Sequence, residues 1–423
     1  MQLKLLNFYK FLSNFANNLV GSFVPLIIYV QTGKLYIAFL YLVCQQAIRL
    51  ATSYFLRNQM RNNPQMFLLF RIVTLTLYNV FILLIDINLW VGVVGVCVFL
   101  AIDTSFKYSA NEYIYNYSSL NKSSKSLGLT RVFEEFGLIA SLLIGGYLLD
   151  VNTVVVIIIS LGLYFISLIP LLIYYFRSRK EKSFNKDATS NAFETLSKDI
   201  HYGKYGKKII YKILLSYFVV YFIFCSYDIF KTTFTLELFA NGSSKYALAG
   251  IIGAVFEATY GVGSYIAGKL IDKYDTTWLA RVACVVMGLC VLSFTFVQSN
   301  ISFYMLFALI GLVYPFLSLF VLQRMLVKSR ILGVSNSAIC NRECACDASY
   351  LVYFGLALLF SLFPKVVFFP VYIAIAVSLF ISAWLVPENE EKTRKLLVDF
   401  LEDNEILNEE KVVEEKEKTS DKW

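Results

Sequence analysis

The sequence consists largely of long apolar runs, each about as long as a helix that crosses a lipid bilayer. At a rise of 1.5 Å per residue, about 20 residues span roughly 30 Å of hydrocarbon. Helices are expected because lipid cannot satisfy the hydrogen bonds of irregular backbone, and no alternating pattern indicates a barrel. We predict twelve spans, near residues 8–30, 35–56, 66–86, 89–113, 127–149, 153–176, 213–238, 246–271, 278–298, 301–325, 333–361 and 365–386.

The amino-acid composition agrees with this interpretation. Only 16% of the 423 residues are charged and 58% are hydrophobic, whereas about 25% of a typical soluble chain is charged. This composition argues against a soluble enzyme, a disulfide scaffold, a disordered chain and a nucleic-acid-binding protein. The sequence therefore predicts an all-α, multi-pass membrane protein that is surrounded by the lipid bilayer.

Lysine and arginine gather in the loops on one side of the predicted membrane. Because such loops stay in the cytoplasm, we expect both termini there, as an even number of spans requires. The formal net charge of +8 then reflects orientation in the cell membrane and implies no nucleic acid. The basic side includes Lys4, Lys10, Arg57, Arg61, Lys122, Lys125, the 177–212 stretch, Lys269, Lys273, Lys328 and Arg330, whereas the opposite loops hold Lys34, Lys245 and Lys365.

A long hydrophilic stretch divides the predicted spans six and six. We expect an N-terminal half at 1–176, a basic cytoplasmic linker at 177–212, a C-terminal half at 213–386 and a charged cytoplasmic tail at 387–423. The linker is suited to lying against anionic lipids, and a regulatory docking site is the alternative. The start of the tail has the apolar spacing of an amphipathic helix.

The two predicted halves repeat each other at a distance of 211 residues. Shifted by this amount, span 35–56 falls on 246–267 and span 127–149 falls on 338–360. Arg131 then meets Arg342, and Gln46 meets Glu257. Sequence identity between the two halves is low. The evidence for the repeat is therefore the shared register of the spans. Many transporters build alternating access from such repeats.

The most specific motif is in the loop expected between spans eight and nine. It reads Gly268-Lys-Leu-Ile-Asp272-Lys273-Tyr-Asp-Thr-Thr and matches in part the signature Gly-x-Leu-x-Asp-basic-x-Gly-basic-basic. With the repeat, it makes the chain resemble the major facilitator superfamily over about residues 5–386. The resemblance implies that Asp272, with Gly268 and Lys273, caps a neighbouring helix and latches one conformation. The first-half counterpart, residues 57–61, lacks the glycine and the acid.

The resemblance also implies a role for several helices. Spans one, four, seven and ten would line a central cavity, and spans two, five, eight and eleven would form the interface across which the halves rock. Span five, with Gly145 and Gly146, is similar to the family's fifth helix, in which small residues allow close packing. It lacks the Gly-Pro signature of many drug–proton antiporters.

Polar and ionisable residues inside the spans are the candidate machinery, because they are costly in lipid and usually face a partner or a cavity. Substrate-binding or proton-coupling candidates are Asn17, Gln46, Arg49, Asp103, Lys107, Arg131, Glu134, Glu135, Asp228, Lys231, Glu257, Arg342 and Glu343. Asp347 is a further charge in span eleven. Ser22 and Pro25 in span one fit a helix hinge, with ordinary packing as the alternative.

Each candidate has an alternative structural interpretation. Asp103–Lys107 and Asp228–Lys231 have helical spacing, so each pair either neutralises itself or contacts solute or proton. Glu257 has no charged partner on its own stretch of helix and is suited to proton coupling. Its alternative is a cross-helix salt bridge with Arg49 or Arg342. Arg131 and Arg342 could clamp an anionic group, or Glu134, Glu135 and Glu343 could neutralise them.

We therefore expect a secondary active transporter that moves a small polar solute by alternating access, coupled to protons, as a monomer without a cofactor. The alternatives are a drug or metabolite efflux antiporter and a transport-inactive, receptor-like protein of the same fold. An enzyme is not expected. The single histidine, His201, lies in the linker, the cysteines lack metal-site spacing, and no Gly-x4-Gly-Lys-Ser/Thr loop is present.

Overall fold

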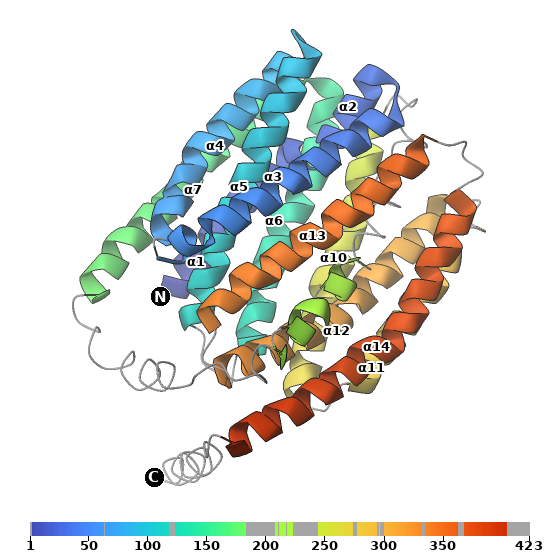
Figure 1. Cartoon of the computed structure of the whole chain (residues 1–423). Helices are drawn as coiled ribbons and strands as arrows, with labels where there is room; N and C mark the ends of the chain where they lie inside the picture. Colours follow the sequence, from blue (N-terminus) through green and yellow to red (C-terminus); the bar gives the residue numbers. More distant parts are fainter. Residues whose placement is uncertain are drawn as a thin grey trace.

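The computed structural model describes residues 2–62, 64–117, 123–182, 208–209, 211–216, 218–222, 244–273, 277–293, 296, 300–331, 335–362 and 368–403. In these ranges the chain is helical and contains no strand (Figure 1). The helices are α1 (Gln2–Gly21), α2 (Val24–Thr32), α3 (Leu35–Asn62), α4 (Pro64–Ile85), α5 (Leu89–Tyr117), α6 (Ser123–Val151), α7 (Thr153–Lys182), α10 (Lys245–Lys273), α11 (Thr277–Ser293), α12 (Asn300–Ile331), α13 (Ser335–Ser361) and α14 (Phe368–Asp403).

Seven helical stretches of the described residues are long and apolar enough to cross a membrane. They agree with the predicted spans to within a few residues at most ends, and span two matches at both ends. Most of the predicted span 213–238 lies outside the described residues. The seven stretches are Asn7–Thr32, Leu35–Leu56, Met66–Ile85, Leu89–Lys107, Thr153–Ile173, Lys245–Ile271 and Ile301–Leu322.

The helix positions agree with the internal repeat. The starts of α3 and α10, at Leu35 and Lys245, differ by 210 residues. The described part of α12 begins at Asn300, 211 residues after Leu89 of α5, and the described part of α13 begins at Ser335, 212 residues after the described part of α6. The shared register of the spans therefore indicated the repeat correctly despite the low letter identity.

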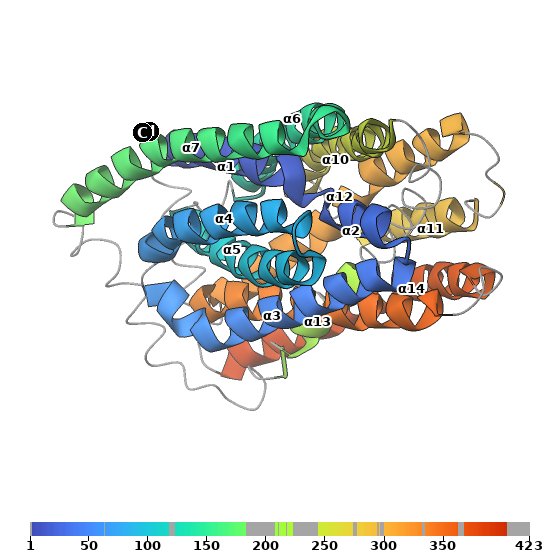
Figure 2. The same cartoon turned by 90° about the horizontal axis from the view of Figure 1, so that it is seen from above.

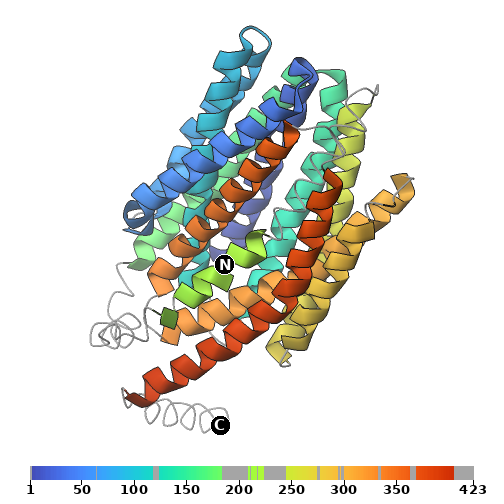
Figure 3. The same ribbon diagram turned by 45° about the vertical axis from the view of Figure 1, so that its right-hand side comes forward.

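Two long helix pairs join the halves. In Figures 1 and 3, α6 lies beside α10 and α3 lies beside α13, and both pairs are in extensive contact. The repeat relates α3 to α10 and α6 to α13, so the two interfaces are equivalent by pseudo-symmetry. Seen from above, α6, α7 and α10 lie along one side, α3, α13 and α14 along the opposite side, and α4, α5 and α12 between them (Figure 2).

Span one is broken near its middle, where a single helix was predicted. Ser22 and Phe23 form a turn between α1 and α2, and the Phe23 amide donates to the Val20 carbonyl at 2.9 Å. Pro25 lies in the first turn of α2, where a missing N–H removes no helical hydrogen bond. The helix is therefore interrupted at the residues expected to form a hinge.

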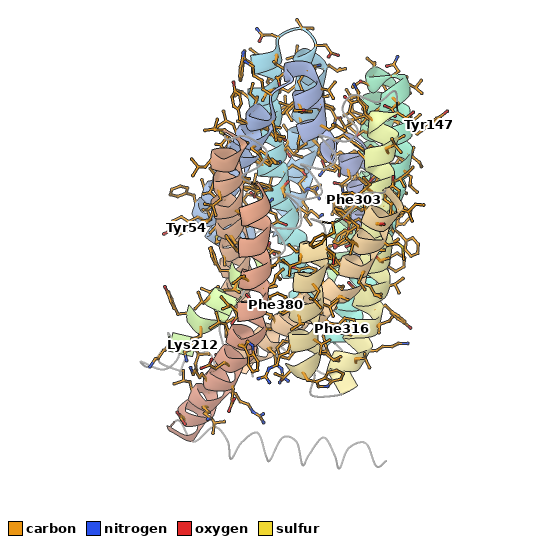
Figure 4. All side chains as sticks on the ribbon, turned by 90° about the vertical axis from the view of Figure 1, so that its right-hand side faces the viewer. Tyr54, Tyr147, Lys212, Phe303, Phe316 and Phe380 are labelled. Atoms are coloured by element: carbon orange, nitrogen blue, oxygen red, sulfur yellow. The ribbon has the colours of Figure 1, made fainter. Side chains whose placement is uncertain are left out.

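Large apolar side chains cover the outside of the bundle, as expected of a surface that faces lipid. Tyr54 and Tyr147 point outward on opposite edges in Figure 4 and are 53% and 66% exposed. Phe303, also labelled there, is only 2% exposed. The hydrophobic core thus lies between the helices, and a second apolar surface lies around them.

The last helix continues well past its predicted span. α14 runs on to Asp403, so the amphipathic helix expected at the start of the tail is continuous with the last span. Its exposed face has helical-spacing pairs, Glu388 with Lys392 and Glu391 with Lys395. The hydrogen bond from Lys392 lowers the pKa of the Glu388 carboxyl. Leu397 on this extension is buried.

Candidate functional site

A fully buried ion pair links α4 to α5. The Arg71 guanidinium donates from Nε to Oδ1 of Asp103 at 3.0 Å and from Nη2 to Oδ2 at 2.9 Å. Its Nη1 donates to the Tyr9 hydroxyl at 3.0 Å, and the Thr74 hydroxyl lies 3.3 Å from the Asp103 carboxylate. Arg71 is 1% exposed and Asp103 is 0% exposed. Two parallel charge-assisted hydrogen bonds make this a geometrically specific pair.

This pair differs from the expectation for Asp103. Its ionic partner is Arg71 on the neighbouring helix rather than Lys107 on its own helix. Arg71 was not among the predicted candidates, although it is the one charged residue in the apolar stretch Met66–Ile85. A single arginine in a span is itself a signal of a buried partner, and that signal would have identified Arg71.

A second buried pair joins α1 to α6. Lys10 Nζ lies 2.5 Å from the Glu134 carboxylate, and both side chains are nearly inaccessible. Glu134 was a predicted candidate, whereas Lys10 had been assigned to the basic loops. Lys10 lies within α1 and is 3% exposed, so it is a structural partner of Glu134. The neighbouring Glu135 is also buried.

A third ion pair crosses between the two halves. Arg49 Nη2 on α3 lies 2.8 Å from Asp347 Oδ1 on α13, and the Ser53 hydroxyl donates to Asp347 Oδ2 at 3.4 Å. The guanidinium also lies 6.0 Å from the ring centroid of Tyr350. Asp347 is 0% exposed. Arg49, a predicted candidate, therefore links the halves through a carboxylate to which the sequence had assigned no role.

The other interface between the halves contains a helix cap. Asp150, near the end of α6, accepts hydrogen bonds from the backbone amides of Tyr246 and Ala247, at 3.3 and 2.9 Å. These amides lie in the first turn of α10 and have no acceptor within their own helix. A carboxylate at this position satisfies two of them and interacts favourably with the helix dipole. The cap thus connects one half to the other.

The remaining candidates are distributed over several helices. Asn17 lies on α1, Gln46 is buried on α3, Glu257 is half-buried on α10, and Glu343 is buried on α13. Arg131 and Arg342 lie on α6 and α13, with their side chains outside the described part. Asp228 and Lys231 lie wholly outside it.

The motif that carried the family resemblance is partly helical. Gly268, Asp272 and Lys273 occupy the last turns of α10, which ends at Lys273, whereas a loop was expected there. The side chains of Asp272 and Lys273 are outside the described part, so the cap proposed for Asp272 stays a prediction. Among the described residues, no group of His, Cys, Asp and Glu could hold a metal ion.

The arrangement of the charges indicates what this bundle can do. The three ion pairs are buried, and each joins two different helices. Breaking such a pair leaves buried charge uncompensated, so each one couples the positions of the helices that it joins. The pairs within one half make that half rigid, and the pair between the halves depends on their relative position.

Comparison with known proteins identifies the fold. The family model of the Major Facilitator Superfamily matches residues 109–340, more than half of the chain. No curated protein matches the chain. The predicted architecture, twelve transmembrane helices in two pseudo-symmetric six-helix halves, fits the fold of this family.

Three similar solved structures show how far the similarity reaches. A bacterial homologue of the iron transporter ferroportin, in an outward-facing state, is 12% identical, with a TM-score of 0.64 over 93% of this chain and 100% of that one. The human organic anion transporter MFSD10 is 11% identical, with a TM-score of 0.61 over 91% and 98%. A D-xylose–proton symporter is 12% identical, with a TM-score of 0.65 over 91% and 96%. The chain belongs to the Major Facilitator Superfamily and is an integral membrane transporter rather than an enzyme.

Proposed function

We propose that this transporter is secondary active and moves a small polar solute by alternating access, coupled to protons. The observation that carries the proposal is the polar contacts between the halves. Asp150 binds the start of α10 at one interface, and Asp347 binds Arg49 and Ser53 at the other. A rocking motion of the halves can break and remake such contacts, as rigid-body transitions do with interface salt bridges.

Proton coupling is proposed for Glu257. It is a half-buried carboxylate in the apolar stretch Lys245–Ile271 of α10, one of the helices at the interface between the halves. Ionisable side chains inside a membrane span usually face a partner or a water-filled cavity, and in transporters they often belong to proton relays. A D-xylose–proton symporter has the same fold, which is compatible with proton coupling.

The proposal is tested by solute uptake into proteoliposomes with an imposed pH gradient. Wild-type protein is expected to accumulate a polar solute only when the gradient is present. Glu257→Gln keeps the shape of the side chain but cannot lose a proton, so it is expected to exchange solute without responding to the gradient. Glu388→Gln is the matched control, because Glu388 is an exposed carboxylate on the extension of α14.

Two outcomes would contradict the proposal. If Glu257→Gln retains the wild-type pH dependence, Glu257 is not the coupling residue. If folded protein moves none of a panel of amino acids, peptides, sugars and common drugs, the transport-inactive, receptor-like alternative is favoured.

We further propose that the protein is a monomer in the cell membrane with both termini in the cytoplasm. The excess of lysine and arginine in the loops on one side supports the orientation. Residues 1–176 and 213–386 would be the two halves, 177–212 the basic linker and 387–423 the cytoplasmic tail. A protease site appended to the C-terminus should be cut in inside-out vesicles but not in intact cells, and the reverse pattern would contradict this orientation.

A further inference from the structure

The break in span one is the starting point. α1 ends at Gly21 and α2 begins at Val24, well inside the apolar stretch Asn7–Thr32. A broken helix leaves backbone groups without their usual partners. In transporters such broken helices are tolerated where they line a site, and they often bind the transported molecule.

A second observation points to the same place. The Tyr78 hydroxyl on α4 is buried and has no hydrogen-bond partner in the described part of the chain, and Tyr78 is 0% exposed. It lies 3.3 Å from the position that a Cβ on Gly21 would occupy, and Asn17 Oδ1 lies 3.7 Å from that position. Asn17 Oδ1 also has no partner there. Two polar atoms from two helices therefore converge on the end of α1 with unused hydrogen-bonding capacity.

Buried polar atoms in native proteins are almost always satisfied by protein, water or ligand. Gly21 leaves room for such a partner because it has no side chain, and Leu100 on α5 is the nearest apolar neighbour, at 4.0 Å. Asn17 and Gly21 are half-buried and Ser22 is exposed, so the break is accessible from one side. Tyr78 is thus the buried end of this cluster and Ser22 its exposed end.

The charges around this site determine which group it can take. Asn17, Gly21 and Tyr78 are uncharged. The nearest turns of α4 contain Arg71, whose charge is already compensated by the bidentate pair with Asp103. An ion entering beside Tyr78 would find this Arg71–Asp103 pair already neutralised, and burying a charge without a partner is unfavourable. An uncharged group with a donor and an acceptor matches both polar atoms.

We propose that Asn17, Gly21 and Tyr78 form a subsite that binds an uncharged hydroxyl or carboxamide group of the transported solute. The proposal rests on the proposed transport function and adds a substrate class to it. The Tyr78 hydroxyl donates to or accepts from the solute group, the Asn17 carboxamide makes the second hydrogen bond, and Gly21 provides the space. The break in the helix brings these three residues to one point.

The test measures binding to purified protein by thermal shift. The neutral probes are D-xylose, glycerol and acetamide, and the charged probes are glutamate and lysine. At least one neutral probe is expected to raise the melting temperature of the wild type, and neither charged probe is. Tyr78→Phe removes one oxygen and is expected to weaken the apparent affinity for that neutral probe about tenfold, as the loss of one hydrogen bond can.

Gly21→Ala fills the space and is expected to abolish the shift. Gly162→Ala on α7 is the matched control, because a Cβ there meets nothing within 4 Å, and it should behave as the wild type. Tyr78→Phe keeps the test decisive if Gly21→Ala does not fold, since it adds no atoms.

Three results of the binding test would overturn the subsite. A neutral-probe shift that survives both Tyr78→Phe and Gly21→Ala would mean that the solute binds elsewhere. A wild type shifted only by charged probes would contradict the substrate class, and a wild type shifted by none would contradict the subsite. The proteoliposome assay is independent of these results, because gradient-driven uptake that is insensitive to Tyr78→Phe leaves the transport function standing and removes only the subsite.

Discussion

The two interfaces between the halves are equivalent by the internal repeat, yet they differ in chemistry. At the α6–α10 interface, glycines bring backbones together. A Cβ on Gly250 would lie 2.2 Å from the Leu142 carbonyl oxygen, and one on Gly146 would lie 2.5 Å from the Tyr246 carbonyl oxygen. At the α3–α13 interface, an ion pair and a serine hydroxyl bridge the helices, and a Cβ on Gly355 of α13 would meet nothing within 4 Å.

The repeat therefore preserves the positions of the helices but not the contacts that hold them together. Close glycine packing gains dispersion contacts along the helices and is insensitive to charge. A buried ion pair is specific to one relative position, because its hydrogen bonds weaken steeply when the geometry changes. We infer that α6–α10 keeps the halves together and that α3–α13 sets which arrangement of the halves is favoured.

The largest expected effect is at the polar interface. Asp347→Ala removes the carboxylate that binds Arg49 and Ser53 and should destabilise the protein by about 3–5 kcal/mol, the usual cost of breaking a buried pair from one side. The measurement is the melting temperature and denaturant midpoint in detergent. Asp347→Asn keeps hydrogen-bonding atoms and should lose less.

A double variant separates charge from packing at this interface. Arg49→Met with Asp347→Leu replaces the pair by apolar side chains of similar size, and it should recover much of the stability that Asp347→Ala loses. Because the pair specifies one arrangement, this variant should nevertheless transport more slowly. Wild-type transport by the double variant would show that the α3–α13 pair is only structural.

A smaller effect is expected at the glycine interface. Gly250→Ala forces a methyl group against the Leu142 backbone and should destabilise the protein by about 1–3 kcal/mol, as overpacking does. Gly355→Ala is the control, because it adds the same methyl group where there is space and removes a flexible residue from a helix. Equal melting temperatures for the two variants would contradict the view that backbone contact holds α6 to α10.

The sequence predicted one interface better than the other, for a physical reason. Gly145 and Gly146 indicated close packing in span five, and a Cβ at either position would lie within 2.5 Å of a backbone oxygen of another helix. Small residues indicate that another helix packs closely, even when that helix is not known. An ion pair needs two residues, and the spacing along one helix identifies only neighbours on that helix. The pairing of Arg49 with Asp347 was therefore not identified from the sequence. Likewise, spacing paired Asp103 with Lys107, either to neutralise each other or to contact solute or proton, whereas its ionic partner is Arg71.

The same limit explains which parts of the architecture could be predicted. Span positions and the repeat follow from apolar length and register, and both agree with the helix boundaries. The break after Gly21 was indicated only by Ser22 and Pro25, because the apolar run itself continues through it. The burial of Lys10 could not be predicted without knowing that Glu134 lies opposite on α6.

The smallest expected effect on stability is at Asp150, the helix cap at the α6–α10 interface. Asp150→Ala removes a helix cap and should destabilise the protein by about 0.5–2 kcal/mol. Because the cap joins α6 to α10, its loss should also make the start of α10 more accessible, measured as faster maleimide labelling of an Ala247→Cys variant. Asp150→Asn retains an acceptor and should label at an intermediate rate.

If labelling accelerates while the melting temperature hardly changes, the glycines hold the interface and Asp150 sets how often it opens. If the melting temperature falls as far as in Gly250→Ala, the cap is part of what holds the helices together, and the contrast between the two interfaces is weaker than their glycines suggest.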